Sequence, residues 1–328
     1  MAILDSIGEL IALPNLRPLD IRRDLMRVAD LIELCFAHTM DVDGKEYLRQ
    51  MRQAARDARF LNWAPKAAER VAMPLSGYVW EESGQIVGNL SLIPMSRQGR
   101  RIYLIANVAV HPDYRRRGIA RALTQTALEG LRHKQIWAAW LQVRDDNSAA
   151  HHLYQSLGFI ERAQRTSWEM FPPSKGRLHT ERDGVSVTSR QTKDWAIQKL
   201  WLTENYPPEV DWNLNFHINE FRPGLLADLL HLIEGTSLKH WAVHRRGYLT
   251  ALLTWQPSHT FADNLWLAMP DSGDNDSLYT LLTQALHDLP ENRSVAINFP
   301  SRRSEDAFIA AGFENHLTLI WMEAILKV

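Results

Sequence analysis

The hydrophobic positions in the first half of the chain follow two periods. Apolar residues at helical spacing predict helices after a cap at Asp24, from about Lys45 to Phe60, and from Ile119 onward. Runs that alternate or are apolar throughout predict strands at residues 16–20, 77–81, 86–93, 102–110 and 136–143. A last helix, 148–157, is stopped by Gly158. This succession predicts an α/β fold, with a mixed, mostly antiparallel sheet around a central parallel strand pair flanked by helices.

A divergent copy of this pattern follows a change in composition. Residues 172–184 (PPSKGRLHTERDG) are rich in proline and charge and lack periodicity, as in a linker. Residues 107–125 align without gaps with residues 266–284, so that a strand, a loop and a Leu-Thr-Gln in a helix coincide. We therefore expect two tandem domains of one fold, with an N-terminal domain at 1–172, a linker at 173–184 and a C-terminal domain at 185–328.

Composition and charge favour an ordinary globular protein. The chain is 45% hydrophobic and 23% charged, and a formal net charge of −1 gives no global attraction to nucleic acid or anionic lipid. The single cysteine, Cys35, rules out an internal disulfide framework. The acidic N-terminus does not fit a signal peptide, and no apolar run approaches the ~20 residues that cross a bilayer. We expect a cytoplasmic monomer or homodimer without nucleic-acid or membrane partners.

A cluster of positive charge precedes the helix at Ile119. Arg115, Arg116 and Arg117 follow an apolar strand, and Gly118 and Ala120 keep the start of the helix small. The N–H groups of a helix N-terminus lack intrahelical partners and carry the positive end of the helix dipole. A phosphate site and a solvated basic loop are both compatible with this stretch alone.

A second motif makes the pattern specific. The order "VAVHPDYRRRGIA", a buried strand and "NSAAHHLYQSLGF" resembles the acetyl-CoA site of the GCN5-related N-acetyltransferase (GNAT) family. The family pattern Q/R-x-x-G-x-G/A is matched by Arg115, Gly118 and Ala120. The tail N-x-x-A-x-x-x-Y-x-x-x-G-F is matched by Asn147, Ala150, Tyr154, Gly158 and Phe159. The resemblance extends from about residue 17 to residue 170, and implies an acyltransferase with two tandem GNAT-like domains.

The resemblance also implies a role for each matched residue. Tyr154 would be the general acid for the CoA thiolate, and the N–H near Val108 would polarise the thioester carbonyl. The primary amine acceptor, a small molecule or a protein N-terminus or lysine, would attack directly, and no metal is expected. The residues expected to bind acetyl-CoA are Val108, Ala109, Val110, Arg115, Arg116, Arg117, Gly118, Ile119, Ala120, Arg121, Asn147, Ala150 and Tyr154.

The general base departs from the family pattern. Ile105 occupies the place where many relatives have a glutamate, and residues 102–110 contain no acid. Asn107 or Tyr103 acting through water, and Glu81 or Glu82 on the neighbouring hairpin, are the alternatives. The missing glutamate keeps open a non-catalytic acyl-CoA sensor. A structural or partner-binding protein with two degenerate copies is a third class, which the intact loop and Tyr154 disfavour.

The C-terminal copy lacks the features of a phosphate site. In the alignment Asp274 replaces Arg115, Ser277 replaces Gly118 and Tyr279 replaces Ala120, and the later "FIAAGF" places Phe308 at Tyr154. Acids repel a phosphate, and a tyrosine blocks close approach to the backbone. We expect this copy to keep the fold without binding the cofactor.

Other features have simpler interpretations. We expect Cys35 to be a core thiol and the acidic run 271–276 to be a solvated loop, rather than a nucleophile and a calcium site. His151 and His152 lack a third ligand at metal-binding spacing. Residues 38–44 either shape the acceptor site or simply connect two helices.

Overall fold

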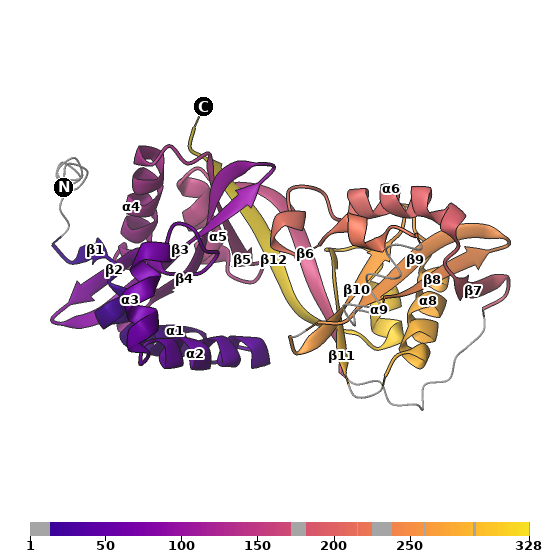
Figure 1. Cartoon of the computed structure of the whole chain (residues 1–328), viewed down its shortest axis with the longest axis horizontal. Coiled ribbons are helices and arrows are strands. Elements are labelled where there is room, and N and C mark those ends of the chain that lie inside the picture. Colours follow the sequence, from indigo (N-terminus) through magenta and orange to yellow (C-terminus); the bar gives the residue numbers. More distant parts are fainter. Residues whose placement is uncertain are drawn as a thin grey trace. The chain divides into compact units, whose positions relative to one another are not determined.

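The chain divides into two compact units (Figure 1). The computed structural model describes residues 14–171, 182–214, 216–224, 238–258, 260–290 and 293–327. Unit 1 comprises Met1–Val143, Asn147–Ile160 and Met322–Val328, and unit 2 comprises Arg144–Asp146 and Glu161–Trp321. The division differs from the expected domain limits, because nearly all of strand β6 (Ile160–Met170) lies in unit 2 and the last seven residues lie in unit 1. Most of the expected linker lies outside the described residues.

Unit 1 is a mixed sheet with helices on its faces. The strand order is β1 (Leu16–Pro18), β2 (Ser76–Glu82), β3 (Gln85–Arg97), β4 (Arg100–Val110), β5 (Ala138–Arg144) and the end of β12 (Glu314–Ile325). The β4–β5 pair is parallel, and the pairs among β1, β2, β3 and β4 are antiparallel. The predicted central parallel pair is therefore confirmed. The helices of this unit are α1 (Ile21–Phe36), α2 (Val42–Ala54), α3 (Ala58–Ala67), α4 (Ile119–His133) and α5 (Ser148–Ser156).

Two helix predictions in unit 1 are wrong in detail. The side chain of Asp20, not Asp24, caps α1 by accepting from the Arg22 N–H. Asp24 is instead completely buried one turn later and pairs with Arg17 at 2.6 Å. The helix predicted from 45 to 60 is two helices, because the Asp57 side chain accepts from two N–H groups and starts α3 anew.

Unit 2 repeats the arrangement. Its strand order is β12, β6, β11 (Ser294–Pro300), β10 (Ala262–Ala268), β9 (Tyr248–Gln256), β8 (Lys239–Arg245) and β7 (Val185–Ser189). The β10–β11 pair is parallel, as β4–β5 is in unit 1. The helices among the described residues of this unit are α6 (Trp195–Asn205), α8 (Asn275–Asp288) and α9 (Glu305–Ala311), with 3-10 turns η3 (Thr192–Asp194), η4 (Asp211–Asn213) and η5 (Ile218–Phe221).

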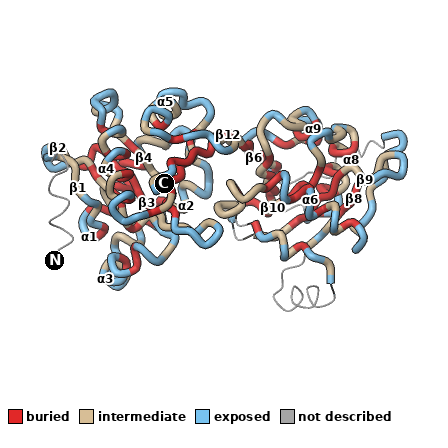
Figure 2. The backbone as a smooth tube through the Cα atoms, turned by 90° about the horizontal axis from the view of Figure 1, so that it is seen from above, coloured by how far each residue is buried: buried red, intermediate tan, exposed pale blue. Residues whose placement is uncertain are grey.

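Each unit has a core of its own along its sheet (Figure 2). In unit 1, Val28 and Leu48 pack helices α1 and α2 against Val79 of β2. In unit 2, Phe308 stacks on Trp168 with ring centroids 5.0 Å apart. Burial of each such side chain stabilises the fold by about 1.5–3 kcal/mol. Among the described residues, no helix combines the length and the apolar character that crossing a membrane requires.

Candidate active site

Strands β4 and β5 separate before either ends. Their parallel pairing runs from Ile102 opposite Ala138 to Ile105 opposite Leu141, whereas β4 continues to Val110. On its other edge β4 stays paired with β3 as far as Gly88 opposite Val110. One edge of residues 106–110 therefore has no strand partner among the described residues, and its backbone groups can receive an extended ligand as an added strand. Val108, Ala109 and Val110, which the sequence analysis expects to bind acetyl-CoA, lie on this segment.

A β-bulge lies in the separated segment. Asn89 pairs with Ala109 and Ser91 pairs with Ala106, so Leu90 faces two residues, Asn107 and Val108. Asn107 has a φ of 52°, in the left-handed region that asparagine tolerates better than most residues. A bulge changes the direction of the backbone groups next to it. From the register shift we infer that the N–H of Val108 is turned relative to the regular ladder.

The helix α4 begins directly after this strand and a 3-10 turn, η2 (Pro112–Tyr114). Its N-cap is Gly118, with a φ of 80° and no side-chain hydrogen bond to the first turn. A Cβ built on Gly118 meets nothing within 4 Å. The glycine is therefore needed for its backbone conformation, and the space in front of the helix N-terminus is open. Such an end, with unsatisfied N–H groups, binds anions readily.

The arginines of the loop are exposed and only partly engaged with the backbone. The Arg115 Nε donates to the Val110 carbonyl at 3.2 Å, and an Arg117 nitrogen donates to the Asp113 carbonyl at 3.0 Å. Arg121, in the first turn of α4, donates to the Ser156 hydroxyl on α5 at 2.8 Å. The loop is thus tied to the end of β4 and to α5, while Arg116 adopts a positive φ of 62°.

The helix α5 contributes the second motif. The Asn147 side chain accepts from the Ala150 N–H at 3.1 Å, so its oxygen is used as a cap and its NH₂ group is what it can offer to a ligand. Tyr154 is only 6% exposed and packs edge-on against Phe159, with ring centroids 5.8 Å apart. Burial raises the pKa of the Tyr154 phenol to about 12. It therefore stays protonated, as a hydrogen-bond donor, throughout the neutral range.

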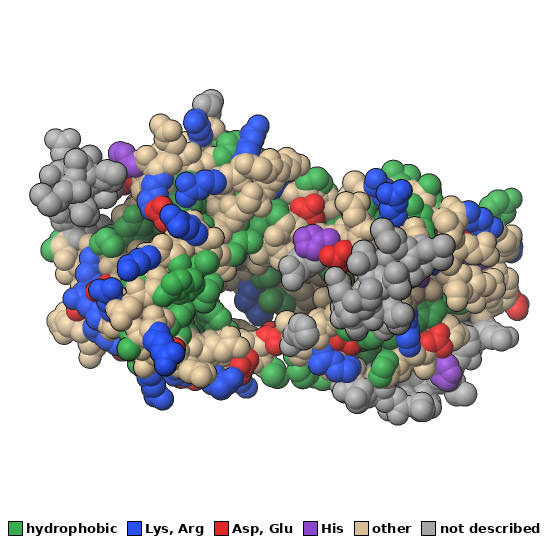
Figure 3. All heavy atoms as spheres, viewed as in Figure 1, with side chains coloured by type: hydrophobic (Ala, Val, Ile, Leu, Met, Phe, Trp, Pro, Cys, Tyr) green, Lys and Arg blue, Asp and Glu red, His purple; other side chains and the backbone are tan. Residues whose placement is uncertain are grey.

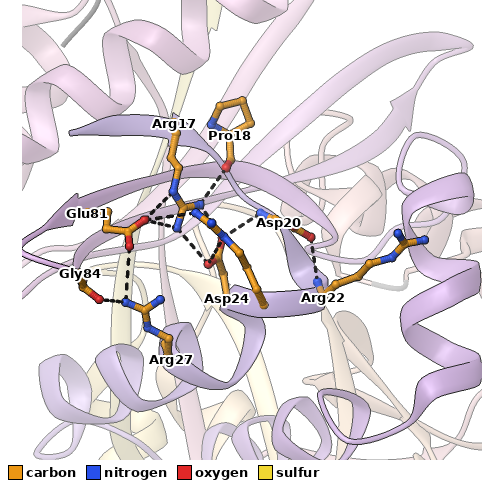
Figure 4. A network of polar contacts seen from close by, with 9 residues as sticks. Arg17, Pro18, Asp20, Arg22, Asp24, Arg27, Glu81 and Gly84 are labelled. Atoms are coloured by element: carbon orange, nitrogen blue, oxygen red, sulfur yellow. Dashed lines mark hydrogen bonds and ion pairs between the residues drawn. The ribbon is translucent and has the colours of Figure 1, made fainter. Parts of the chain in front are cut away.

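The structure disfavours three of the four suggested bases. Glu81 lies in a network with Arg17, Arg23 and Arg27 (Figure 4), and the hydrogen bond from Arg17 holds the pKa of its carboxyl below the usual value. Glu82 lies 4.0 Å from Arg117, on the side of the arginine loop. Tyr103 is buried where β4 and β5 are still paired, opposite Ala139. None of the three faces the bulge through a described contact.

Asn107, the fourth suggestion, belongs to a polar cluster that sequence reasoning missed. Its Nδ2 donates to the Tyr47 hydroxyl at 2.9 Å and to Ser91 Oγ at 3.4 Å. The backbone carbonyl of Asn107 accepts a hydrogen bond from Asn89 Nδ2 at 2.9 Å. An amide does not take up a proton at neutral pH, so Asn107 acts by hydrogen bonding. The helical period assigns Tyr47 to an apolar face of α2, and only the fold brings it to β4.

Cys35 also lies beside the separated segment. The thiol donates to the Val110 carbonyl at 3.3 Å and is half-buried. Burial raises the pKa of this thiol, although the neighbouring Arg115 acts in the opposite direction. It is therefore a protonated thiol rather than an activated nucleophile, and it packs against the core of unit 1 without being as fully buried as the sequence predicted.

In unit 2, side chains of the protein hydrogen-bond the backbone groups that correspond to the free edge of β4. Its parallel pairing ends at Asn264 opposite Ala296, while β10 continues to Ala268. The alignment places Leu267 at Val108 and Met269 at Val110. Here the Leu267 N–H donates to the Tyr206 hydroxyl at 3.2 Å, and the Met269 N–H donates to Asn205 Oδ1 at 3.0 Å. Side chains from the end of α6 thus occupy the two amides.

The loop of unit 2 that corresponds to the arginine loop also has its helix N-terminus occupied by a side chain of the protein. Asp274 is the N-cap of α8 and accepts from the Ser277 N–H at 3.1 Å, so the helix starts one turn earlier than the alignment implies. Asp274 also pairs with Arg245, Asp276 pairs with Arg182 at 2.8 Å, and Asp271 pairs with Arg303 at 2.9 Å. The acidic run lies in a solvent-exposed loop, as expected, and its acids are in addition paired with arginines. A carboxylate takes the place that an anion would need.

Comparison with known proteins relates the first unit to a family of acetyltransferases. Residues 37–159 match the family model described as acetyltransferase (GNAT) family. A segment is 42% identical over 71 residues to the [ribosomal protein bS18]-alanine N-acetyltransferase of Escherichia coli K12, covering 22% of this chain and 47% of that protein. The N-alpha-acetyltransferase RimI of Mycobacterium tuberculosis is 36% identical over 99 residues, covering 30% and 61%. The chain thus spans about half the length of the first of these relatives.

A solved structure matches the chain along almost its whole length. The GCN5-related N-acetyltransferase of Sphaerobacter thermophilus has a TM-score of 0.58 and 13% sequence identity, and the match covers 96% of both chains. At this identity the likeness shows the fold alone.

Proposed function

The chain belongs to the GNAT family through residues 37–159, and on that basis we propose that it transfers an acetyl or other short acyl group from acyl-CoA to a primary amine. One observation carries the proposal. The free edge of β4 runs directly into an open helix N-terminus with an arginine loop, so one continuous surface offers backbone groups and then a phosphate-binding end.

The residues present fit acetyl-CoA. The edge at Val108–Val110 would hold the extended pantetheine arm, and the amides from Arg116 to Arg121 would hold the pyrophosphate. Arg115, Arg116 and Arg117 would add charge that suits several phosphate geometries. Asn147 would donate to the arm from the side, and Ala150 keeps that side of α5 small. Bound acetyl-CoA would supply an activated acetyl thioester.

Two groups of the chain would then act on the reacting atoms. The Val108 N–H, turned by the bulge, would donate to the thioester carbonyl as negative charge develops on its oxygen. The Tyr154 phenol, which remains protonated, would donate to the sulfur as it leaves. A nearly buried phenol is suited to hydrogen-bond donation, because burial disfavours its charged form.

The acceptor that fits best is an α-amino group. Neither β4 nor the cluster around Asn107 contains a carboxylate, so the amine must reach the site unprotonated. With pKa values near 7.8 for an α-amine and 10.4 for lysine, about a third of α-amines but only about 0.1% of lysines are neutral at pH 7.5. The alanine and N-alpha acetyltransferases among the relatives have acceptors of this kind.

Unit 2 would hold no CoA. Its two corresponding amides already have side-chain partners, and Asp274 occupies the start of α8. The unit would instead support unit 1 or a partner.

The test is calorimetric titration with acetyl-CoA, followed by mass spectrometry of peptide products. We expect one site per chain and loss of at least 100-fold in affinity in Gly118→Glu. Gly99→Glu is the matched control, because Gly99 has a φ of 74° and equally open space at its Cβ. A peptide with a free α-amine should be acetylated, and the same peptide with a blocked N-terminus and a lysine should not. Two sites per chain would contradict the assignment of unit 2.

The same experiment separates the sensor from the enzyme. A sensor would bind acetyl-CoA at one site and give no product with any amine, whatever the pH. An enzyme that relies on neutral amine should show a kcat/KM that rises with pH up to the pKa of the acceptor. If wild type did not bind acetyl-CoA, the arginine loop would be a basic surface and not a phosphate site.

A further inference from the structure

Three hydrogen bonds hold Asn107 in the bulge of β4. Asn107 Nδ2 donates to Tyr47 and, at longer range, to Ser91, and Asn89 donates to the Asn107 carbonyl. Asn89 is completely buried, and Tyr47 and Asn107 are half-buried. A left-handed non-glycine residue costs free energy and persists only when its surroundings fix it. These hydrogen bonds fix Asn107, the residue directly before the Val108 N–H.

The cluster links one helix to two neighbouring strands. Tyr47 comes from α2, Asn89 and Ser91 come from β3, and Asn107 comes from β4. Asn89 Oδ1 is buried without a hydrogen-bond partner among the described residues. An unsatisfied buried acceptor costs about 1–3 kcal/mol, so stability alone does not explain this arrangement.

We propose that Tyr47 is a positioning residue that fixes Asn107, and through it the direction of the Val108 N–H. This inference rests on the proposed function, since that N–H acts on the acyl carbonyl. It makes α2 part of the catalytic apparatus, because Tyr47 acts through its hydrogen bond with Asn107. Removal of the phenol oxygen leaves Asn107 free to relax toward regular strand geometry, and the Val108 N–H turns with it.

Three variants separate the hydrogen bond from the backbone conformation. Tyr47→Phe removes the bond and keeps the ring. Asn107→Gly keeps access to a positive φ and removes the side chain, whereas Asn107→Ala removes both. Tyr78→Phe is the matched control, because its hydroxyl is also largely buried but lies against Gly130 of α4.

We expect kcat to fall 10- to 100-fold in Tyr47→Phe and in Asn107→Gly, with the dissociation constant of acetyl-CoA within twofold of wild type. Complete loss of an oxyanion donor costs about 10²–10³ in kcat, and misalignment should cost less. The double variant Tyr47→Phe/Asn107→Gly should lose no more kcat than either single variant, because both substitutions remove the same hydrogen bond. Tyr78→Phe should keep its kcat.

A second measurement does not depend on turnover. Amide hydrogen exchange at residues 106–110 of the ligand-free protein should be faster in Tyr47→Phe than in wild type and unchanged in Tyr78→Phe. Unchanged exchange together with wild-type kcat in Tyr47→Phe would overturn the inference. Full activity of Asn107→Gly would also overturn it, because backbone conformation alone would then suffice. Failure of the proposed function looks different, since wild type itself would then neither bind acetyl-CoA nor acetylate any amine.

Discussion

At the scale of single residues, Tyr154 combines two properties that point to one role. It is nearly buried, and its phenol has a pKa of about 12. A free phenol loses its proton near pH 10, so the site has moved this loss outside the range in which an enzyme works. The proton is therefore available for donation at every physiological pH.

Substitution of Tyr154 should affect turnover and not binding. We expect Tyr154→Phe to lower kcat about 100-fold, within the usual range for a proton donor, with the dissociation constant of acetyl-CoA changed by less than threefold. In wild type kcat should not decline between pH 7 and 10 through this group, because the raised pKa keeps it protonated there. A decline near pH 9 that disappears in Tyr154→Phe would contradict the assignment. The pH profile of kcat measures both.

At the scale of elements, the start of α1 depends on a buried ion pair. Asp24 accepts from Arg17 at 2.6 Å and from the Asp20 N–H at 2.9 Å, and Arg17 also reaches Glu81 on β2 (Figure 4). Desolvation opposes the charge of Asp24, yet the hydrogen bonds from Arg17 and from the Asp20 N–H hold the pKa of its carboxyl below the usual value. The network fixes α1 against the edge of the sheet, and it explains why Glu81 is not available as a base.

Loss of this carboxylate should unfold unit 1 more easily. We expect Asp24→Asn to cost about 3 kcal/mol in urea denaturation, because Arg17 loses its buried partner. The depressed pKa stabilises the fold above about pH 4 and this contribution is lost as the pH falls through the folded-state value, so the difference between wild type and variant should shrink in acid. Asp30 lies on the same helix as Asp24, and its exposed carboxylate pairs with Arg52 of α2, so Asp30→Asn should cost less than about 1 kcal/mol. Equal costs for both would show that burial does not matter here.

Sequence patterns predicted the elements that carry their own signals. The helices α4 and α5, with Gly118 and Asn147 at their starts, and the parallel pair β4–β5 follow from periodicity and capping residues. The break between α2 and α3 was missed because apolar spacing continues across Asp57. Local patterns are strongest where the residue that starts or stops an element is itself unusual.

Contacts between distant segments could not be predicted in this way. Tyr47 lies 60 residues from Asn107, and Tyr206 lies 61 residues from Leu267, and neither member of each pair marks the other in the sequence. The assignment of β6 to unit 2 and of the last residues to unit 1 depends on which strand edges pair. Register and partner choice are properties of the whole sheet, so a single strand does not reveal them.

At the scale of the whole molecule, the near-zero net charge hides two opposite halves. Unit 1 contains 21 lysines and arginines and 16 acids, whereas unit 2 contains 16 and 22. On the face shown in Figure 3, the basic side chains gather mainly over unit 1. A highly charged anion such as CoA would therefore meet a favourable potential only at the unit proposed to bind it, and the acidic excess of unit 2 agrees with its filled site.

Because this attraction is local, its dependence on salt should depend on position along α4. Arg116 and Arg132 lie at opposite ends of the helix, about 20 Å apart at 1.5 Å per residue, which is twice the screening length of about 10 Å at 0.1 M salt. We expect acetyl-CoA affinity to fall with salt in wild type, and to fall less steeply in Arg116→Gln because one charge near the phosphates is gone. Arg132→Gln, an exposed arginine in the last turn, should keep the wild-type slope. Calorimetric dissociation constants between 20 and about 500 mM salt measure the slopes, since screening grows over this range. If Arg132→Gln flattened the slope as much as Arg116→Gln, the overall charge of unit 1, and not the loop at the helix N-terminus, would attract the ligand.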